Sequence, residues 1–302
     1  MAPGLRLRLV TWVTRRVARP MLQRTGTPQK AAADFARCAR LGFRVPPYLC
    51  HLTEICDGLK LHWISVGQVD PDRVILYLHG GAYLSGSGDT HCALVGRLSR
   101  LSGLRACVPD YRLLQDAPFP AAFQDACAAW DMLRARGYAP RDIVLGGDSA
   151  GGGLMLALLS HLTRRGEVPA SAFALSPWTD LTMSGATLGC ETEALLPIDR
   201  MTEVVDLYLE GADRKDPRAS PLFARFNAPP PVLIQVGAQE ALADDARRMT
   251  RALQKAGGAV TLREWPTALH VFQILDGWLP ESRIALSEVA RFIQVSFDNA
   301  RR

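Results

Sequence analysis

The sequence predicts an α/β domain in which a mostly parallel β-sheet is covered by helices on both faces. The main observation is an alternation, over most of the 302 residues, of short apolar runs with longer segments of helical periodicity. A second is that 48% of the residues are hydrophobic and 22% are charged, an ordinary globular composition. A chain of this length also has enough material for a sizeable core.

The strand-like and helix-like segments follow one another along the chain. Because parallel neighbours in a sheet are joined by crossovers, this order predicts mostly parallel strand pairs. The expected strands are 59–66, 73–78, 105–108, 143–145, 173–175, 232–236 and 260–265. The expected helices are 123–136, 149–164, 241–255 and 281–297.

Residues 5–22 form an N-terminal segment with apolar residues at helical spacing. The arginines fall largely off this stripe, which predicts an amphipathic helix that Pro20 stops or kinks. Such a helix packs on its own protein or lies on a membrane surface. We expect packing on the protein, with membrane-surface contact through residues 5–22 as the alternative. The stripe consists of Leu5, Leu9, Trp12, Val13, Val17 and Met21.

Residues 182–225 interrupt the alternation of strands and helices. The segment is polar, contains prolines and has a helix-like centre at 200–209. It is therefore expected to be an insertion over the sheet rather than part of it.

Charge and cysteine usage exclude several classes of function. The net charge is +5, and residues 1–33 hold seven basic and no acidic side chains. The rest is close to neutral, which argues against a nucleic-acid-binding protein. The seven cysteines include no Cys-x-x-Cys pair, so neither a zinc site nor a redox site is expected. With no secretory signal and no apolar run of about 18 residues, the chain is expected to be cytoplasmic.

A glycine-rich turn joins the expected strand 143–145 to the expected helix 149–164. Residues 147–151 read Gly-Asp-Ser-Ala-Gly, which matches the Gly-x-Ser-x-Gly nucleophile elbow. In such an elbow a serine projects above the sheet edge at a helix N-terminus, where developing negative charge is favoured. The alternative is a glycine-rich turn that merely links strand to helix.

A second glycine-rich turn follows the expected strand 73–78. Residues 79–83 read His-Gly-Gly-Ala-Tyr, and two glycines allow successive amides to turn toward a ligand. The turn is therefore a candidate oxyanion hole. For His79 itself, a role in fixing the loop suits the position better than proton transfer.

These motifs together resemble the hormone-sensitive-lipase-like (bacterial family IV) esterases of the α/β-hydrolase fold. Residues 79–82 are similar to the family's His-Gly-Gly-Gly motif, and residues 147–152 to its Gly-Asp-Ser-Ala-Gly-Gly motif. Residues 109–113 and 176–181 resemble family segments that flank the site. Because several motifs occur in the family's order, a non-catalytic turn becomes the weaker interpretation.

The resemblance implies a carboxylesterase that works through an acyl-enzyme and needs no cofactor or metal. Its nucleophile would be Ser149, and the amides of Gly80, Gly81 and Ala150 would form the oxyanion hole. The segment departs from the family at Ala82, whose methyl group narrows the pocket, and at residues 114–116, where the family has Ala-Pro-Glu.

The family's order of serine, acid and histidine assigns the other two members of a triad. His270 alone among the six histidines lies far enough downstream in a loop after a strand. The acid follows the strand before last, where Glu240 stands at the matching position and can orient the imidazole. Glu240 is also suited to a helix start, and Asp244 is the alternative acid.

The resemblance also suggests a domain organisation and a partner. Residues 1–45 and the insertion 182–225 would form a helical cap on the catalytic domain 46–302, shaping a pocket for short or medium acyl chains. The expected partner is a small-molecule ester, and the protein is expected to be a monomer or homodimer. Two other functions remain: removal of acetyl groups from a natural product or sugar, and ligand binding without catalysis. A plant gibberellin receptor of this fold illustrates the second and lacks the catalytic histidine.

Overall fold

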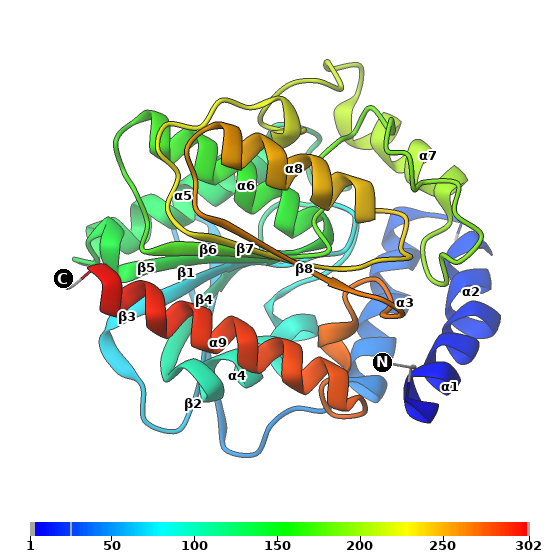
Figure 1. Ribbon diagram of the computed structural model, residues 1–302, viewed down its shortest axis with the longest axis horizontal. Coiled ribbons are helices and arrows are strands. Elements are labelled where there is room, and N and C mark those ends of the chain that lie inside the picture. Colours follow the sequence, from blue (N-terminus) through cyan, green and yellow to red (C-terminus); the bar gives the residue numbers. More distant parts are fainter. Residues whose placement is uncertain (1–3, 25, 301–302) are drawn as a thin grey trace.

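The computed structural model describes residues 4–24 and 26–300, and these form an eight-stranded sheet at the centre of the molecule (Figure 1). The strand order is β1-β2-β4-β3-β5-β6-β7-β8. The pairs β1–β2 and β2–β4 are antiparallel and all later pairs are parallel, which confirms the mostly parallel sheet. The strands are β1 (Leu49–Cys56), β2 (Leu59–Val66), β3 (Asp70–Leu78), β4 (Leu104–Pro109), β5 (Ile143–Asp148), β6 (Ser171–Leu175), β7 (Val232–Gly237) and β8 (Val260–Trp265).

Helices cover both faces of this sheet. Helices α5, α6 and α8 lie on one face, and α4 and α9 lie on the other (Figure 1). The helices are α1 (Leu5–Val13), α2 (Arg19–Arg24), α3 (Pro28–Gly42), α4 (Gly88–Ser102), α5 (Ala121–Ala135), α6 (Ser149–Arg164), α7 (Ile198–Leu209), α8 (Ala243–Lys255) and α9 (Pro280–Ala300). Shorter turns are the π-helix η1 (Thr14–Ala18) and the 3₁₀ helices η2 (Pro140–Asp142), η3 (Pro221–Phe223) and η4 (Phe272–Leu275).

The sheet separates two parts of the hydrophobic core. Along β3, Val74 and Leu76 pack toward α5 and α6, whereas Ile75 and Tyr77 pack toward α4 and α9. All four side chains are fully buried, because successive residues of a strand point to opposite faces and both faces are covered. Each such side chain contributes roughly 1.5–3 kcal/mol on burial. The covered sheet therefore holds its strand ends in fixed positions.

Every segment predicted as a strand or helix from residue 59 onward is confirmed. One strand and two α-helices were not predicted: β1, α3 and α4. The apolar residues of β1 give little signal, because Leu52 and Ile55 on this edge strand are exposed. Helix α4 packs on the sheet and on α9 and buries His91 and Ser99. It therefore lacks a clear division into an apolar and a polar face.

Of the two outcomes predicted at Pro20, a stop and a kink, the stop does not occur. The chain remains helical from Leu5 to Arg24 through α1, η1 and α2. The wider π turn lies just before Pro20, where a regular α-helix would bring the proline ring against the carbonyl of Arg16. The π turn thus provides a local adjustment at which a proline is accommodated.

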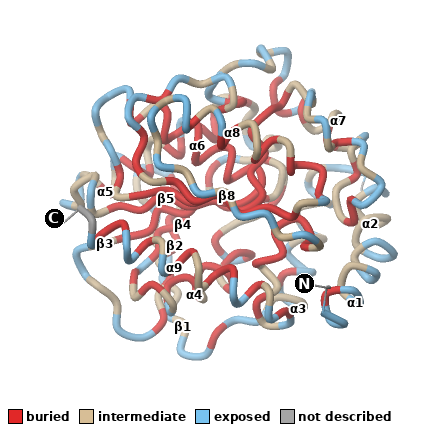
Figure 2. Tube along the Cα trace, viewed as in Figure 1, coloured by how far each residue is buried: buried red, intermediate tan, exposed pale blue. Residues whose placement is uncertain are grey.

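The N-terminal helix packs on the protein, as expected, but its apolar stripe does not make this contact and faces solvent. Leu5, Leu9, Trp12 and Val17 are 82%, 60%, 58% and 60% exposed. Leu7 is buried instead, so the helix rests on the body by a different face. Figure 2 shows α1 and α2 mainly as exposed or intermediate trace. We call Leu5, Leu9, Trp12, Val13 and Val17 the outward stripe.

The N-terminal helices and the insertion 182–225 lie at the same end of the sheet. Figure 1 shows α1, α2 and α7 at this end of the molecule, beyond the strand ends. Arg15 donates to the carbonyl of Thr192 at 2.8 Å, and Arg19 donates to that of Glu193 at 2.8 Å. Within the described residues, no helix combines the length and apolar character required to cross a bilayer.

Candidate active site

Ser149 stands in a sharp turn between β5 and α6. Its φ angle is 51°, in the left-handed region that non-glycine residues seldom adopt. The glycines on either side permit close approach: a Cβ on Gly151 would clash with the carbonyl oxygens of Leu78 and His79, and one on Gly147 with the carbonyl of Gly151. The close approach of the neighbouring backbone explains why the motif has glycines on either side of the serine. The sharp turn that they permit lets the Ser149 hydroxyl project above the sheet edge.

The structure brings Ser149, His270 and Glu240 together at the carboxyl ends of three strands. They follow β5, β8 and β7, respectively. His270 Nε2 lies 2.9 Å from Ser149 Oγ, a hydrogen-bond distance. His270 Nδ1 lies 3.6 Å from Glu240 Oε1, slightly beyond one. The three side chains are at most 9% exposed, so their interactions are shielded from water.

Ser176, which the sequence analysis did not single out, connects the acid to the histidine loop. Its hydroxyl donates to Glu240 Oε2 at 3.0 Å and accepts from the Val271 amide at 3.2 Å. One carboxylate oxygen of Glu240 is therefore fixed by Ser176 while the other faces His270. Residues 176–181 had been noted only as a segment that resembles the family, which was the available signal.

Burial and charge oppose each other at the histidine and the acid. Burial by itself lowers the pKa of His270, but the neighbouring Glu240 carboxylate outweighs it, and the net pKa is raised. Burial raises the pKa of Glu240, against the opposing effect of His270. The pair therefore favours a His270 that can accept and hold a proton.

Asp148, directly before the serine, is a buried anchor for the turn that contains Gly80. Its Oδ1 accepts from the Tyr77 hydroxyl at 2.8 Å and from the Gly80 amide at 3.0 Å, and His91 Nε2 lies 3.4 Å from Oδ2. Burial alone would raise the pKa of Asp148, but these partners outweigh it, and the pKa lies below its ordinary value. The carboxylate is thus held in its charged form.

This contact corrects the expected oxyanion hole. Because the Gly80 amide donates to Asp148, it does not point freely at a substrate oxygen. The amides of Gly81, Ala82 and Ala150, by contrast, have no acceptor within residues 4–24 and 26–300. The φ angles of Gly81 and Ala82 are 126° and 54°, so the chain turns sharply at both. Within the described residues, the free amides of this loop are thus those of Gly81 and Ala82 rather than those of Gly80 and Gly81.

His79 has the structural position expected for a residue that fixes the loop. Its ring stacks on Tyr111 with centroids 4.2 Å apart, and its Nδ1 lies 2.9 Å from the Gly80 carbonyl. The Tyr111 hydroxyl donates to the His79 carbonyl at 2.6 Å. Burial and the neighbouring His91 lower the pKa of His79 to about 4, so it remains neutral near pH 7.

Asp244, which the sequence left as the alternative acid, has Ala186 and Arg248 as its partners instead of the histidine. Its Oδ2 accepts from the Ala186 amide at 3.0 Å and lies 3.0 Å from Arg248 Nε. Asp245 Oδ2 accepts from the amides of Thr179 and Asp180 at 2.8 and 3.0 Å. Both carboxylates therefore tie α8 to the chain that follows β6.

A cavity of about 410 Å³ adjoins the histidine and the acid. Its lining comes from α1 and η1, from the insertion, and from the loops after β7 and β8. Ser149 is absent from the lining, so the cavity lies on the Glu240 side of the imidazole. The lining residues closest in sequence to the triad are Gln239, Glu240, Leu269 and His270.

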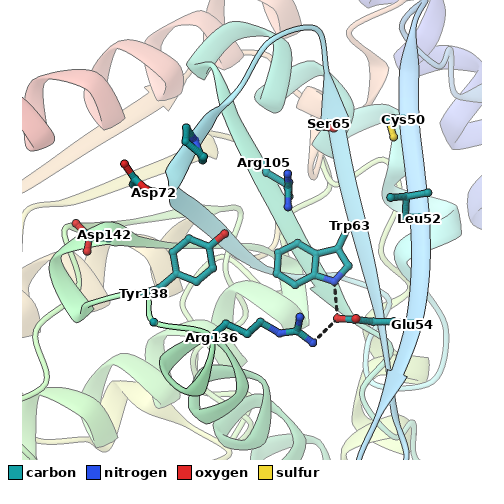
Figure 3. A pocket seen from close by; sticks show the side chains of 12 residues that line it. Cys50, Leu52, Glu54, Trp63, Ser65, Asp72, Arg105, Arg136, Tyr138 and Asp142 are labelled. Carbon is teal, nitrogen blue, oxygen red and sulfur yellow. Dashed lines mark hydrogen bonds and ion pairs between the residues drawn. The ribbon is translucent and has the colours of Figure 1, made fainter.

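A second, larger cavity of about 800 Å³ lies at the opposite edge of the sheet. Figure 3 shows Arg105 and Arg136 beside the Trp63 ring, and Glu54 bridges the Trp63 indole and Arg136, both at 2.6 Å. Its lining includes the starts of β3 and β4 and the chain before β5. No member of the triad lies in it, so the chemistry is at the other end of the strands.

One cluster in the described chain has the spacing of a metal site. It consists of His51, His62 and Asp89, whose potential ligand atoms lie within 4.8 Å of one another. Asp110 fixes His62 through its Nε2 at 2.8 Å. The Lys60 ammonium lies 3.7 Å from Asp89 and 3.4 Å from Asp110. Because this ammonium already balances the carboxylates, the group is poorly suited to a divalent cation.

The chain is similar to proteins of one fold family along most of its length. Residues 75–274 match the family model described as the alpha/beta hydrolase fold. An acetyl-hydrolase of Streptomyces hygroscopicus is 38% identical over 272 residues, 89% of this chain and 90% of that protein. An esterase of Acinetobacter venetianus is 33% identical over 74% of this chain and 76% of its own length.

Solved structures agree with these sequence matches. An esterase from the bacterial hormone-sensitive lipase family superposes with a TM-score of 0.91 at 34% identity. The match covers 98% of this chain and all of that one. The likeness thus includes the N-terminal helices and the insertion as well as the sheet.

Proposed function

The chain belongs to the hormone-sensitive-lipase-like esterases of the α/β-hydrolase fold and is a serine carboxylic ester hydrolase, and from this premise we propose that Ser149, His270 and Glu240 are its catalytic triad. The observation that carries the proposal is the 2.9 Å distance from Ser149 Oγ to His270 Nε2, with Glu240 behind the imidazole. A serine hydroxyl becomes an effective nucleophile when a base within hydrogen-bond reach takes its proton.

In the first half of the proposed reaction Ser149 Oγ attacks the ester carbonyl carbon while His270 Nε2 takes its proton. The carbonyl oxygen becomes an oxyanion, which the amides of Gly81, Ala82 and Ala150 would stabilise. The ester C–O bond then breaks, and His270 returns the proton to the leaving alkoxide. The products of this half are an alcohol and an acyl-enzyme.

The second half returns the enzyme to its starting state. His270 takes a proton from water, whose oxygen attacks the acyl carbon and forms a second oxyanion. This intermediate expels Ser149 Oγ, which regains the proton from His270, and the carboxylic acid leaves. Throughout, Glu240 would hold the imidazole tautomer and stabilise its charged form.

We further propose that residues 1–45 and the insertion 182–225 act as the cap of the site. Support comes from the bonds of Arg15 and Arg19 to the carbonyls of residues 192 and 193, which tie the two segments to each other. Both segments also contribute to the lining of the cavity beside His270. A cap built from two tied segments would shape the substrate site as one unit.

Short or medium acyl chains are the proposed substrates. Support comes from the aromatic rings beyond the oxyanion loop: Tyr83 stacks on Tyr208 with centroids 4.0 Å apart, and Trp178 lies 6.4 Å from Tyr83. All three rings are buried in one apolar core cluster, and Ala82 packs against that cluster. A narrow site would favour small acyl groups, and the named acetyl-hydrolase relative keeps an acetyl ester of a natural product or sugar as the second candidate.

A series of p-nitrophenyl acetate, butyrate, octanoate and palmitate tests the proposed function. We expect kcat/KM to be highest for acetate or butyrate and at least about tenfold lower for palmitate, because a narrow acyl site would not accommodate a long chain. A peak at palmitate would contradict the short-chain proposal. Failure to hydrolyse any of the four, by protein that also resists a serine-directed phosphonate, would favour ligand binding without catalysis.

The pH dependence of kcat/KM tests the proposed base. Because the pKa of His270 is raised above the ordinary histidine pKa of about 6.5, its imidazole becomes mostly neutral at a higher pH than that of an ordinary histidine. We therefore expect kcat/KM to rise with pH and reach half its maximum above that value. In Glu240→Gln the stabilising charge is lost, so the midpoint should move down. The rate of inactivation by a phosphonate, followed against pH, measures the midpoint in the parent protein and in Glu240→Gln. An identical midpoint in the two proteins would contradict the role of Glu240.

A further inference from the structure

The outward stripe combines exposed apolar side chains with unpaired positive charge. Four exposed arginines lie in the same helical segment as the stripe, residues 5–24, and none forms an ion pair with a carboxylate in the described chain. They are Arg6, Arg8, Arg16 and Arg24. Residues 1–33 contain no acidic residue. The surface is therefore both apolar and positively charged.

The arginines are arranged around the stripe rather than opposite it. At about 100° per residue, Arg6 and Arg8 lie on the two borders of the arc formed by Leu5, Leu9 and Trp12. The Glu281 carboxylate lies beside Gly4, the residue that precedes α1. Glu193 instead turns its carboxylate inward to the amides of Ala241, Leu195 and Leu196. The positive charge of the stripe's borders is thus left largely uncompensated.

We propose that the outward stripe docks the protein on an anionic phospholipid surface. Leu5, Leu9 and Val17 would enter the boundary between headgroups and acyl chains, where Trp12 also prefers to lie. The arginine stems would run along the apolar surface and their guanidinium groups would bind lipid phosphates. An anionic bilayer matches both properties of the surface.

A second copy of the chain is the less suitable occupant. A two-fold contact would place the stripe against itself and bring the bordering arginines of both copies together. Like charges brought together at an interface oppose association. An anionic lipid surface instead satisfies these charges, with attraction that weakens as salt increases.

Docking would have a geometric consequence for the proposed active site. Leu7, Arg8, Thr11, Trp12 and Arg15 line the cavity that also contains His270. Trp12 and Arg8 thus belong to both surfaces. A docked helix would hold this cavity next to the lipid surface, but docking itself does not depend on catalysis.

Vesicle sedimentation tests the proposal with the full chain carrying Ser149→Ala, so that hydrolysis cannot alter the lipid. Phosphatidylcholine vesicles are compared with vesicles that also contain phosphatidylglycerol, each at low and high salt. We expect at least about tenfold stronger binding to the anionic vesicles at low salt, and a marked loss at high salt. Brominated lipids should quench Trp12 fluorescence, identified by its loss in Trp12→Phe.

Matched variants distinguish binding through the outward stripe from nonspecific binding through other exposed apolar residues. Leu5→Ser/Leu9→Ser/Val13→Ser removes apolar side chains that are already exposed, so the fold should persist, and vesicle binding should fall at least about tenfold. The control, Leu41→Ser/Leu52→Ser/Ile55→Ser, changes residues that are 82%, 63% and 76% exposed elsewhere, and should bind normally.

Three results would overturn the proposal. The first is no sedimentation with anionic vesicles at low salt. The second is an equal loss of binding in the stripe variant and its control. The third is a dimer in solution that the stripe variant abolishes, without vesicle binding, since a second copy would then be the occupant. Because the assay uses inactive protein, none of these outcomes bears on the catalytic roles of Ser149, His270 and Glu240.

Discussion

Replacing Ser149 with alanine is expected to lower kcat by about 10⁶-fold, the loss seen when a serine triad is deprived of its nucleophile. The residual rate would come from the oxyanion donors and from substrate binding. The fold should be unaffected, because the Ser149 hydroxyl has His270 as its side-chain partner and bears no other structural bond among the described residues. The measurement is steady-state hydrolysis of p-nitrophenyl butyrate, with thermal unfolding as the check on folding.

Ser171 provides the matched control for this variant. It is a fully buried serine in the same sheet, at the start of β6, and its hydroxyl has no partner in the described structure. Ser171→Ala should therefore keep kcat within about twofold of the parent. A Ser149→Ala protein that retains most of its activity, or a phosphonate that labels another residue, would show that Ser149 is not the nucleophile.

Glu240→Gln is expected to lower kcat by about 10³- to 10⁴-fold, the scale at which loss of the orienting carboxylate acts in a serine triad. The amide keeps the size of the side chain and a carbonyl oxygen, but it removes the charge that stabilises protonated His270. Glu240→Asp should retain part of the rate, because the charge remains while the distance to His270 Nδ1, now 3.6 Å, increases.

Asp244→Asn is the control for the position of the acid. Its carboxylate bonds the Ala186 amide and Arg248, so its loss should affect thermal stability more than kcat. Both variants are compared at saturating substrate after unfolding curves show that they are folded. A larger fall of kcat in Asp244→Asn than in Glu240→Gln would reverse the assignment of the acid.

The sheet and the candidate nucleophile could be predicted because their signals are local. Apolar runs mark the strands, and the Gly-x-Ser-x-Gly motif places Ser149 directly after β5. Glu240 and His270 lie in the loops after β7 and β8, and their assignment needed the resemblance to the family as well. The carboxyl ends of parallel strands meet at one edge, so the order of the elements brings these residues together.

Contacts between distant segments could not be predicted in the same way. Ser176 bridges Glu240 and Val271, and Asp148 accepts a hydrogen bond from the Gly80 amide. Both contacts depend on side-chain directions, which the periodicity of a sequence does not specify. The outward stripe illustrates a further limit. Its spacing predicted a helix with an apolar face, but a helical pattern does not specify whether that face meets protein, solvent or lipid.

The stacked pair of Tyr83 and Tyr208 joins two regions that are far apart in sequence. Tyr83 directly follows Gly81 and Ala82, whereas Tyr208 belongs to α7 in the insertion, and the rings are nearly parallel at 4°. A displacement of α7 that admits a bulky substrate would also pull on the loop that carries the two free amides. Opening of the site would then disturb the amides that stabilise the oxyanion, so a poorly fitting ester would be cleaved more slowly once bound. In kinetic terms, selectivity would be expressed in kcat as well as in KM.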